Sequence, residues 1–380
     1  MPPFPSRGVR PPSLKRSTPL LKAKIALIFT LLILISGCAR QAPASGWSSP
    51  IVSGDTLYVG SPGGRVYALD AATGQKRWET RIVEEKSTTG LYSSPIVGES
   101  LVYLGTFEGK VVALDAEKGQ IRWEFETGGA VVATPLLGGD TLSHRDTFVY
   151  VTSSDHKVYA LRAQDGSKVW EFETGARIWG GGALGGGLLY IGSFDGGLYA
   201  LNQESGEKIW EFKAGGAIAS TPRLAQGVVY FGSLDNKVYA LDADSGEKIW
   251  EFKTQNWVWS QPLVSGDRVY FGSLDHKMYA LDREGNEVWA FDTGGAIRSS
   301  PLLAQGLLIF GSGDGHLYAL DQERGKEIWR FPQQERLGAI YSTPSVAQET
   351  LYFSSYGGKV YALQVEDGNQ LWEFEMDKEG

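Results

Sequence analysis

Four histidines and a single cysteine are the side chains of this chain best suited to metal binding or nucleophilic chemistry. They are His144, His156, His276, His316 and Cys38. The histidines are far apart in sequence and three of them fall in predicted turns of separate segments, so no spacing typical of a zinc site groups them. The sequence also contains no Cys-x-x-Cys-His haem motif, no phosphate-binding loop and no Gly-x-Ser-x-Gly motif. We therefore predict neither a catalytic residue nor a metal site.

Tryptophan, unlike histidine, recurs in a regular pattern. The segment Tyr-Ala-Leu-Asp, followed by a turn with glycine and then by tryptophan, is clearest at Tyr67–Trp78 and Tyr239–Trp250. The repeat tryptophans lie 39 to 47 residues apart and are Trp78, Trp123, Trp170, Trp210, Trp250, Trp289, Trp329 and Trp372. A period of about 40 residues indicates one supersecondary unit that is repeated along the chain.

Each repeat contains four short strand patterns. In residues 217–254, runs rich in apolar, β-branched or aromatic residues occur at 217–222, 228–232, 237–241 and 248–252, and turn residues separate them. Four antiparallel strands in about 40 residues are typical of a propeller blade. Eight copies predict an all-β fold, an eight-bladed β-propeller of four-stranded antiparallel blades, over residues 47–380.

We interpret the repeat tryptophans as structural docking residues. A tryptophan ring is large enough to fill the wedge between neighbouring blades, and its indole N–H needs a nearby carbonyl. The glycine of each turn suits a positive backbone φ, and the aspartate at the turn start can accept backbone N–H bonds. We expect the rings to be buried between blades.

The spacing of these residues resembles a known family. Ala-x-Asp-x-x-Thr/Ser-Gly-x-x-x-Trp, read at Ala68–Trp78 and Ala240–Trp250, is similar to the tryptophan-docking motif of propellers related to pyrroloquinoline-quinone (PQQ) enzymes. The other six repeats are partial copies of the motif. The PQQ dehydrogenases that share this motif are typically much longer than this chain, and many place a disulfide between adjacent cysteines against the cofactor. This chain has neither feature, so we predict no cofactor, and PQQ is an alternative that no residue supports.

The N-terminal segment is typical of an exported protein. Residues 1–24 carry six Lys or Arg residues and no acid, and residues 25–35 are apolar apart from Thr30. Ile35-Ser36-Gly37-Cys38 resembles the bacterial lipobox. We predict a lipoprotein signal peptide over 1–37, lipidation of Cys38 and a short tether over 38–46; the alternative is an ordinary signal peptide with an incidental cysteine. Ala39 favours the outer membrane, facing the periplasm, in a host with two membranes.

The size, the lipobox and the bare eight-bladed form resemble the BamB family, which are lipoproteins of the outer-membrane β-barrel assembly machinery and act as non-enzymatic scaffolds. The repeats here are more regular than is expected of that family, and no partner-binding residue of the family is matched by a motif in this chain. The resemblance implies envelope proteins as partners, the β-barrel assembly machinery among them. The net charge of −8 argues against nucleic acid. We expect a monomer that a lipid anchor attaches to the membrane.

Strand counting assigns the loops of the predicted blades to two faces. Calling the strands of a blade A to D from the centre outwards, the A–B and C–D loops share one face, and the B–C and D–A loops share the other. Two D–A links are enlarged, near residues 84–89 and 333–336. The lipid tether enters blade 1 on the same face. Tolerated insertion in surface loops is the alternative explanation.

The mouth of the central channel is the candidate binding site. Strand A is innermost, and the third residue before its proline is Trp47, Tyr92, Val132, Trp179, Ala219, Trp259, Arg298 or Tyr341 in the eight repeats. Arg177 and Trp257 lie two residues earlier in their repeats. Aromatic and arginine side chains are enriched where proteins bind partners. The candidate funnel residues are Tyr92, Arg177, Trp179, Trp257, Trp259, Arg298 and Tyr341. The alternative is that these large side chains plug the channel.

Together these features predict a lipid-anchored scaffold that binds protein partners in the cell envelope, in outer-membrane protein assembly. Two alternatives come from other classes: a PQQ-dependent oxidoreductase that uses the funnel, and a surface lipoprotein that binds carbohydrate or peptide.

Overall fold

The computed structural model describes residues 48–84, 89–140 and 146–377. Within these ranges every regular element is a β-strand, and none of these residues belongs to a helix with the length and apolar character needed to cross a membrane. The predicted signal peptide, Cys38, the tether, Trp47 and His144 lie outside the described residues.

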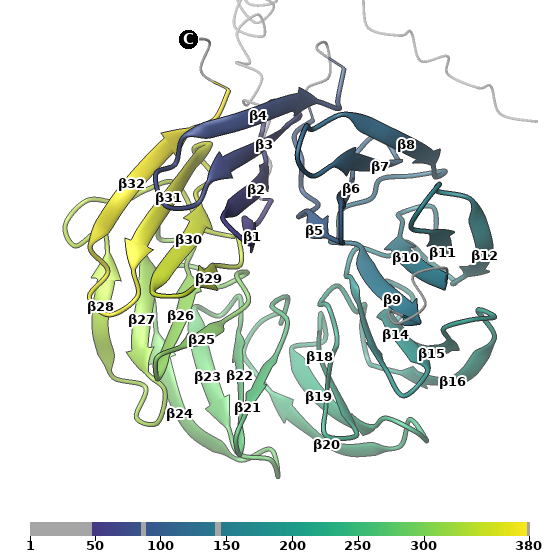
Figure 1. The fold of residues 1–380 in the computed structure, drawn as a ribbon. Coiled ribbons are helices and arrows are strands. Elements are labelled where there is room, and N and C mark those ends of the chain that lie inside the picture. The colour runs from purple at the N-terminus through teal and green to yellow at the C-terminus, as the bar shows by residue number, and fades with distance from the viewer. Residues whose placement is uncertain (1–47, 85–88, 141–145, 378–380) are drawn as a thin grey trace, which may run out of the picture. The chain divides into compact units, whose positions relative to one another are not determined.

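The strands form eight four-stranded antiparallel sheets in which consecutive strands pair, so that each sheet is one blade. Figure 1 shows the blades arranged around a central axis, each with its first strand innermost. Blades 1 and 2 consist of β1 (Ile51–Ser53), β2 (Thr56–Gly60), β3 (Arg65–Asp70), β4 (Lys76–Arg81), β5 (Ile96–Val97), β6 (Leu101–Gly105), β7 (Lys110–Asp115) and β8 (Ile121–Glu126). Blades 3 and 4 consist of β9 (Leu136–Asp140), β10 (Asp146–Thr152), β11 (Lys157–Arg162), β12 (Lys168–Glu173), β13 (Gly182–Gly185), β14 (Leu188–Gly192), β15 (Gly197–Asn202) and β16 (Lys208–Lys213).

The second half of the chain repeats this pattern. Blades 5 and 6 consist of β17 (Arg223–Ala225), β18 (Val228–Ser233), β19 (Lys237–Asp242), β20 (Lys248–Lys253), β21 (Leu263–Ser265), β22 (Arg268–Gly272), β23 (Lys277–Leu281) and β24 (Glu287–Asp292). Blades 7 and 8 consist of β25 (Leu302–Ala304), β26 (Leu307–Gly311), β27 (Leu317–Asp321), β28 (Glu327–Phe331), β29 (Ser345–Ala347), β30 (Thr350–Ser354), β31 (Lys359–Gln364) and β32 (Gln370–Glu375). The predicted fold class is therefore confirmed.

The two middle strands of each blade supply the core. β18 and β19 carry Val229, Phe231, Val238 and Leu241, all of which are fully buried. The outer strand β20 alternates between exposed and half-buried residues because one of its two faces meets solvent. The hydrophobic core is thus a series of clusters between neighbouring blades, and each cluster draws on the middle strands of two blades.

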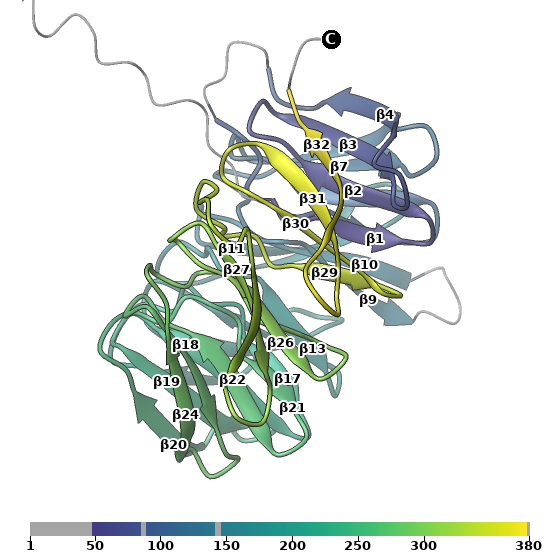
Figure 2. The ribbon, with the colours of Figure 1, turned by 90° about the vertical axis from the view of Figure 1, so that its left-hand side faces the viewer.

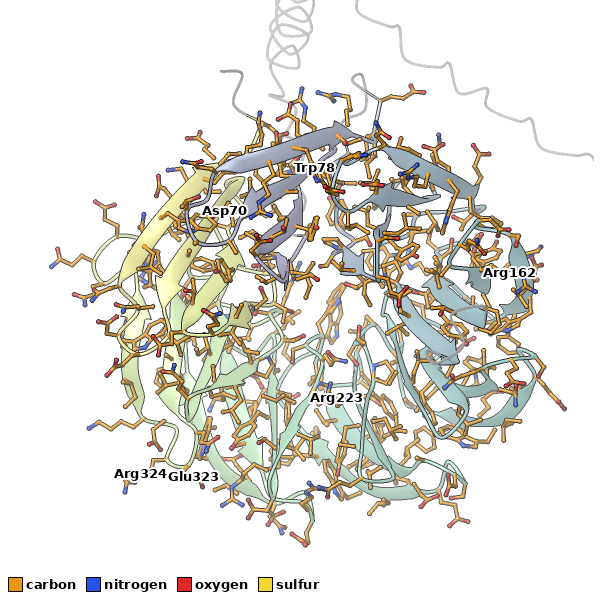
Figure 3. All side chains as sticks on the ribbon, in the orientation of Figure 1. Asp70, Trp78, Arg162, Arg223, Glu323 and Arg324 are labelled. Atoms are coloured by element: carbon orange, nitrogen blue, oxygen red, sulfur yellow. The ribbon has the colours of Figure 1, made fainter. Side chains whose placement is uncertain are left out.

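Each repeat tryptophan docks onto the next blade around the ring. The indole Nε1 of Trp250 donates a hydrogen bond of 2.7 Å to the carbonyl of Arg283, in the turn between β23 and β24. A Cβ atom built on Gly285 of that turn would lie 2.8 Å from the Trp250 ring, so glycine is needed for close approach as well as for its positive φ of 88°. The sequence predicted a nearby carbonyl; the structure places it in the neighbouring blade. Figure 3 shows Trp78 on the outermost strand of blade 1.

The tryptophans are less buried than we expected. Trp123, Trp170 and Trp329 are 7–8% exposed, whereas the other five are half-buried. The cause is their position on strand D, whose outer edge faces solvent while the ring reaches inwards to the next blade.

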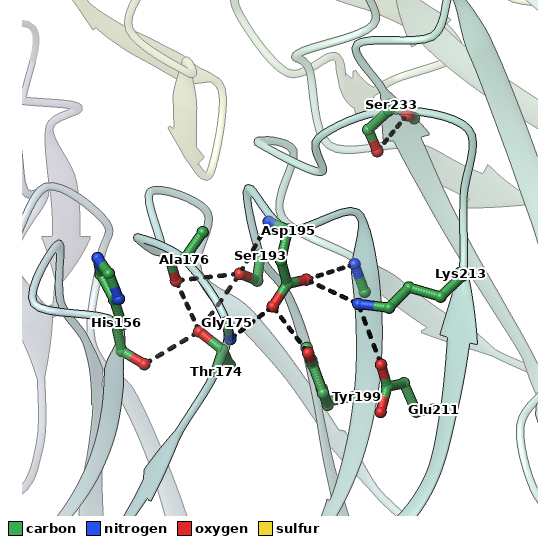
Figure 4. A network of polar contacts seen from close by, with 12 residues as sticks. His156, Thr174, Gly175, Ala176, Ser193, Asp195, Tyr199, Glu211, Lys213 and Ser233 are labelled. Atoms are coloured by element: carbon green, nitrogen blue, oxygen red, sulfur yellow. Dashed lines mark hydrogen bonds and ion pairs between the residues drawn. The ribbon is translucent and has the colours of Figure 1, made fainter.

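A recurring aspartate ties the B–C turn of one blade to the end of strand D in the previous blade. In blade 4, Asp195 accepts hydrogen bonds from the Gly175 N–H (2.7 Å), from the Tyr199 hydroxyl (2.8 Å) and from the Gly197 N–H (2.7 Å). Figure 4 shows this network together with Lys213, whose Nζ lies 3.3 Å from Asp195. Burial opposes ionisation of Asp195, but these hydrogen bonds outweigh it and hold the pKa of its carboxyl below the usual value. Equivalent bonds are made by Asp155, Asp235, Asp275 and Asp314.

Blades 8 and 1 close the ring through non-covalent contacts. At this closure the aspartate comes from the end of strand D in blade 8 and not from the B–C turn of blade 1. Blade 1 has Gly63 at the turn position, and Asp377, just after β32, supplies the carboxylate instead. It accepts hydrogen bonds from the Gly63 N–H (2.7 Å) and the Ser61 hydroxyl (2.8 Å), and a longer one from the Tyr67 hydroxyl (3.3 Å). The indole of Trp372 completes the closure with a 3.0 Å bond to the Ala71 carbonyl. Figure 2 shows blades 1 and 8 side by side.

Backbone hydrogen bonds confirm the predicted assignment of loops to faces. The A–B and C–D loops of blade 1 meet through the bond from Ala71 N to Asp55 O (2.9 Å), and the B–C turn meets the D–A link through the bond from Ile82 N to Gly64 O (3.0 Å). The enlarged link at 333–336 lies on the D–A face, because Leu337 N bonds to Gly315 O in the B–C turn of blade 7. The first enlarged link lies largely outside the described residues, which omit 85–88.

Candidate functional site

A buried serine fixes the entry of strand A in most blades. Two residues before the strand-A proline or its equivalent, Ser220 Oγ accepts the Gly232 N–H at 2.8 Å and donates to the Gly232 carbonyl at 2.9 Å. Ser48, Ser93, Ser260 and Ser342 make the same kind of contact to strand B. These bonds hold the D–A link against the blade, so that the neighbouring side chains point towards the channel.

A belt of small polar side chains follows at the next position and links neighbouring blades. Thr343 N donates to Ser49 Oγ at 2.8 Å, Ser49 N donates to Ser94 Oγ at 2.8 Å, and Gln261 N donates to Ser300 Oγ at 3.0 Å. We name this the hydroxyl belt: it comprises Ser49, Ser94, Thr134, Thr221, Ser300 and Thr343, and blade 6 has the amide Gln261 at the equivalent position. The belt borders two cavities, one of about 360 Å³ and one of about 380 Å³.

The 360 Å³ cavity is the mouth of the channel on the D–A face. Its large side chains are Tyr92, Phe107, Trp179, Trp259, Arg298 and Tyr341. All except Phe107, which comes from a B–C turn, occupy the third position before a strand-A proline or its equivalent. The structure therefore brings together five of the seven predicted funnel residues around a single cavity, with space left between them.

Aromatic and arginine side chains form a continuous arc around one side of the mouth. The Arg177 guanidinium lies 4.6 Å from the Trp179 ring and 4.5 Å from the Phe194 ring. The Trp179 and Trp259 rings are 6.1 Å apart. The Arg298 guanidinium lies 5.2 Å from Trp259 and 4.9 Å from Tyr341. The Tyr341 and Tyr356 rings are 6.2 Å apart. We call this the aromatic arc: it comprises Phe194, Arg177, Trp179, Trp259, Arg298, Tyr341 and Tyr356.

Two predicted funnel residues lie outside the cavity lining. Arg177 is exposed and stacks on Trp179 from outside, whereas Trp257 is 44% exposed on the same face. Sequence reasoning missed Phe107, Phe194 and Tyr356, which occupy the second position of their B–C turns. The rule that places B–C turns beside D–A links would have found them, since most other blades have smaller residues at that position.

The mouth carries positive charge in an acidic protein. Arg298 is the one charged side chain among the described residues that line the cavity. Its Nε is buried without a hydrogen-bond partner. In the part of the chain that the structure describes, no group of three or more His, Cys, Asp or Glu side chains is placed to hold a metal ion. His316 instead lies in a B–C turn, where its Nδ1 is 2.9 Å from the Pro332 carbonyl oxygen.

Comparisons with known proteins agree with this architecture. The crystal structure of BamB from Moraxella catarrhalis has a TM-score of 0.69 and 23% sequence identity, and the match covers 83% of this chain and 95% of that one. The crystal structure of the computationally designed Ika8 protein has a TM-score of 0.71 and 14% identity, and the match covers 85% of this chain and 98% of that one. No curated protein matches this sequence. The family model described as outer membrane protein assembly factor BamB matches residues 37–93, 83–180, 154–261 and 235–379. This chain therefore belongs to the family of the outer membrane protein assembly factor BamB.

Proposed function

We propose that this protein is a non-enzymatic, lipid-anchored scaffold that binds protein partners in the cell envelope and takes part in outer-membrane protein assembly. The aromatic arc carries the proposal. It presents tryptophan, tyrosine and arginine on the rim of an open cavity, and these residue types dominate binding hot spots. Family membership supports the assembly role, and the lipobox at Cys38 supports attachment to the membrane.

The partner binds the D–A face in this proposal. The exposed Trp257, the arc and the enlarged link at 333–336 all lie there. The opposite face consists of C–D turns that are closely similar from blade to blade, as in the Asp242 and Asp321 turns. Near-identical turns offer a partner few distinguishing contacts, whereas the channel-facing position of the D–A links holds tyrosine, valine, tryptophan, alanine or arginine, depending on the blade.

Site-specific crosslinking in native membranes tests this function. A photo-crosslinking residue in place of Trp257 is expected to capture components of the β-barrel assembly machinery or its barrel substrates, identified by mass spectrometry. The matched control places the same residue at Glu204, which is exposed in a C–D turn of the opposite face. Capture of assembly components from position 204 and not from position 257 would refute the assignment of the face. Capture of no envelope protein from either position would refute the scaffold role.

A further inference from the structure

The chemistry of the mouth indicates what part of a partner enters it. The charged and hydroxyl side chains around the cavity are placed as hydrogen-bond donors. Arg298 has five N–H donors, and no hydrogen bond or ion pair to a described residue involves its side chain. Its stacking between Trp259 and Tyr341 holds the guanidinium plane in place.

The hydroxyl belt adds further donors. The oxygens of Ser94, Thr221 and Ser300 each accept a backbone N–H at 2.8–3.0 Å. A hydroxyl group has one proton to donate in addition to its acceptor sites. None of these three hydroxyls donates a hydrogen bond to a described residue, so their protons are available to an acceptor in the cavity. Arg298 and the belt therefore complement a group that is rich in acceptors and negatively charged.

We infer that the mouth binds a carboxylate that is joined to an apolar group, of the kind present at the C-terminal end of a peptide chain or in a small carboxylic acid. A guanidinium matches the planar geometry of a carboxylate with two parallel hydrogen bonds. A partly buried arginine without a counter-charge is costly, and a bound carboxylate relieves that cost. The aromatic walls accept the attached apolar group. This inference rests on the proposed function, because it specifies how a partner protein reaches the mouth.

The geometry favours a chain end over a folded surface or a sugar. A cavity of about 360 Å³ is near the lower limit for ligand sites and admits a terminal residue rather than a domain. Trp179 already contacts Arg177, Phe194 and Trp259, which reduces the ring area available for stacking against a sugar.

Calorimetric titration of the purified full chain tests the inference. The probes are an unstructured hexapeptide that ends in leucine with a free carboxylate, the same peptide with a C-terminal amide, 4-methylpentanoate and inorganic phosphate. We expect the free-acid peptide to bind about tenfold to hundredfold more tightly than the amide, which is the range for a hydrogen bond to a charged group. Arg298→Gln should abolish this difference, and Arg298→Lys should restore it in part. Arg330→Gln is the matched control, because Arg330 also stacks on an aromatic ring, that of Tyr318, but lies outside both the cavity lining and the aromatic arc, and it should keep the difference.

Each outcome decides the question. If 4-methylpentanoate binds as tightly as the free-acid peptide, the carboxylate site stands and its source is a small molecule. Equal binding of acid and amide, absence of binding by both acids, or displacement of the peptide by phosphate would overturn the inference. The comparison of acid with amide needs no variant, so it holds even if Arg298→Gln unfolds the protein. Crosslinking from Trp257 does not depend on a carboxylate, so the scaffold proposal and this inference can fail separately.

Discussion

Replacing Asp377 by alanine tests how the ring is closed between blades 8 and 1. The Asp377 side chain is 22% exposed and accepts two short hydrogen bonds, from Ser61 and from Gly63. Ser61 is fully buried, so its hydroxyl would lose a partner that water cannot easily replace. Hydrogen bonds to charged groups contribute about 1.5–3 kcal/mol each, and partial exposure places these at the low end. The long bond from Tyr67 and the Arg65 ion pair at 3.6 Å add little.

We therefore expect Asp377→Ala to lower the free energy of unfolding by about 2–3 kcal/mol. At about 2 °C per kcal/mol for a large domain, the melting temperature should fall by about 5 °C. Denaturant titration and calorimetry measure both quantities. Asp244→Ala is the control, because Asp244 is an exposed turn residue whose carboxylate makes no hydrogen bond or ion pair with a described residue; it should change neither quantity.

A carboxylate swap makes this test sharper. A Cβ atom on Gly63 would lie 2.6 Å from the Asp377 carboxyl carbon, so Gly63→Asp alone should destabilise by crowding and by charge repulsion. Gly63→Asp combined with Asp377→Gly recreates the arrangement of blades 3 to 7 and should recover most of the lost stability. A double variant that is as unstable as the sum of the two single variants would refute the reasoning. So would an Asp377→Ala protein that unfolds like the wild type.

Three further predictions concern the docking rings, the phenols and the anchor. Trp250→Ala should destabilise by about 3 kcal/mol in denaturant titration, at the low end for a buried ring because Trp250 is half-buried, whereas the exposed Trp257→Ala should leave the unfolding midpoint unchanged. Burial and the bond to Asp195 raise the pKa of Tyr199 to about 12. Because the unfolded state loses this proton at a lower pH than the folded state, the free energy of unfolding should fall as pH rises from about 10 to 12. Tyr199→Phe should make this fall of the unfolding free energy with pH less steep. Cys38→Ser should prevent formation of the membrane-bound mature protein, and mass spectrometry that finds an unmodified Cys38 in mature wild-type protein would contradict the lipid anchor.

The repeat period was sufficient to predict the fold. Eight copies of an apolar pattern with period 2, each ending in tryptophan, predict eight blades, and strand counting places the loops without coordinates. The carbonyl that accepts each indole N–H was not predictable, because it belongs to the next blade and the motif describes one blade at a time. The closure by Asp377 was not predictable for the same reason. In the sequence of blade 1, Gly63 stands where other blades have aspartate, and Asp377 follows the last strand; only the fold shows that the two residues meet.

The funnel was predicted in part. Alignment on the strand-A proline identified Tyr92, Trp179, Trp259, Arg298 and Tyr341, because a residue at a fixed distance from strand A must face the channel. Alignment does not say how far a side chain reaches around the ring. That depends on its neighbours, and the B–C turns that add Phe194 and Tyr356 to the arc come from elsewhere in the repeat.

The small residue at position 219 determines how far two neighbouring tryptophan side chains can reach around the mouth. Ala219 occupies in blade 5 the position that Trp179 and Trp259 occupy in blades 4 and 6, and it is 2% exposed. The two tryptophan rings lie 6.1 Å apart although blade 5 separates their backbones, so both reach over the space that a larger residue at 219 would fill. Alanine at this position does not by itself indicate a binding site in the sequence, but its small side chain allows the arc to be continuous from blade 4 to blade 8. The candidate site therefore arises where the blades differ from one another: large side chains occupy the channel-facing position in blades 4 and 6, and a small one occupies it in blade 5 between them.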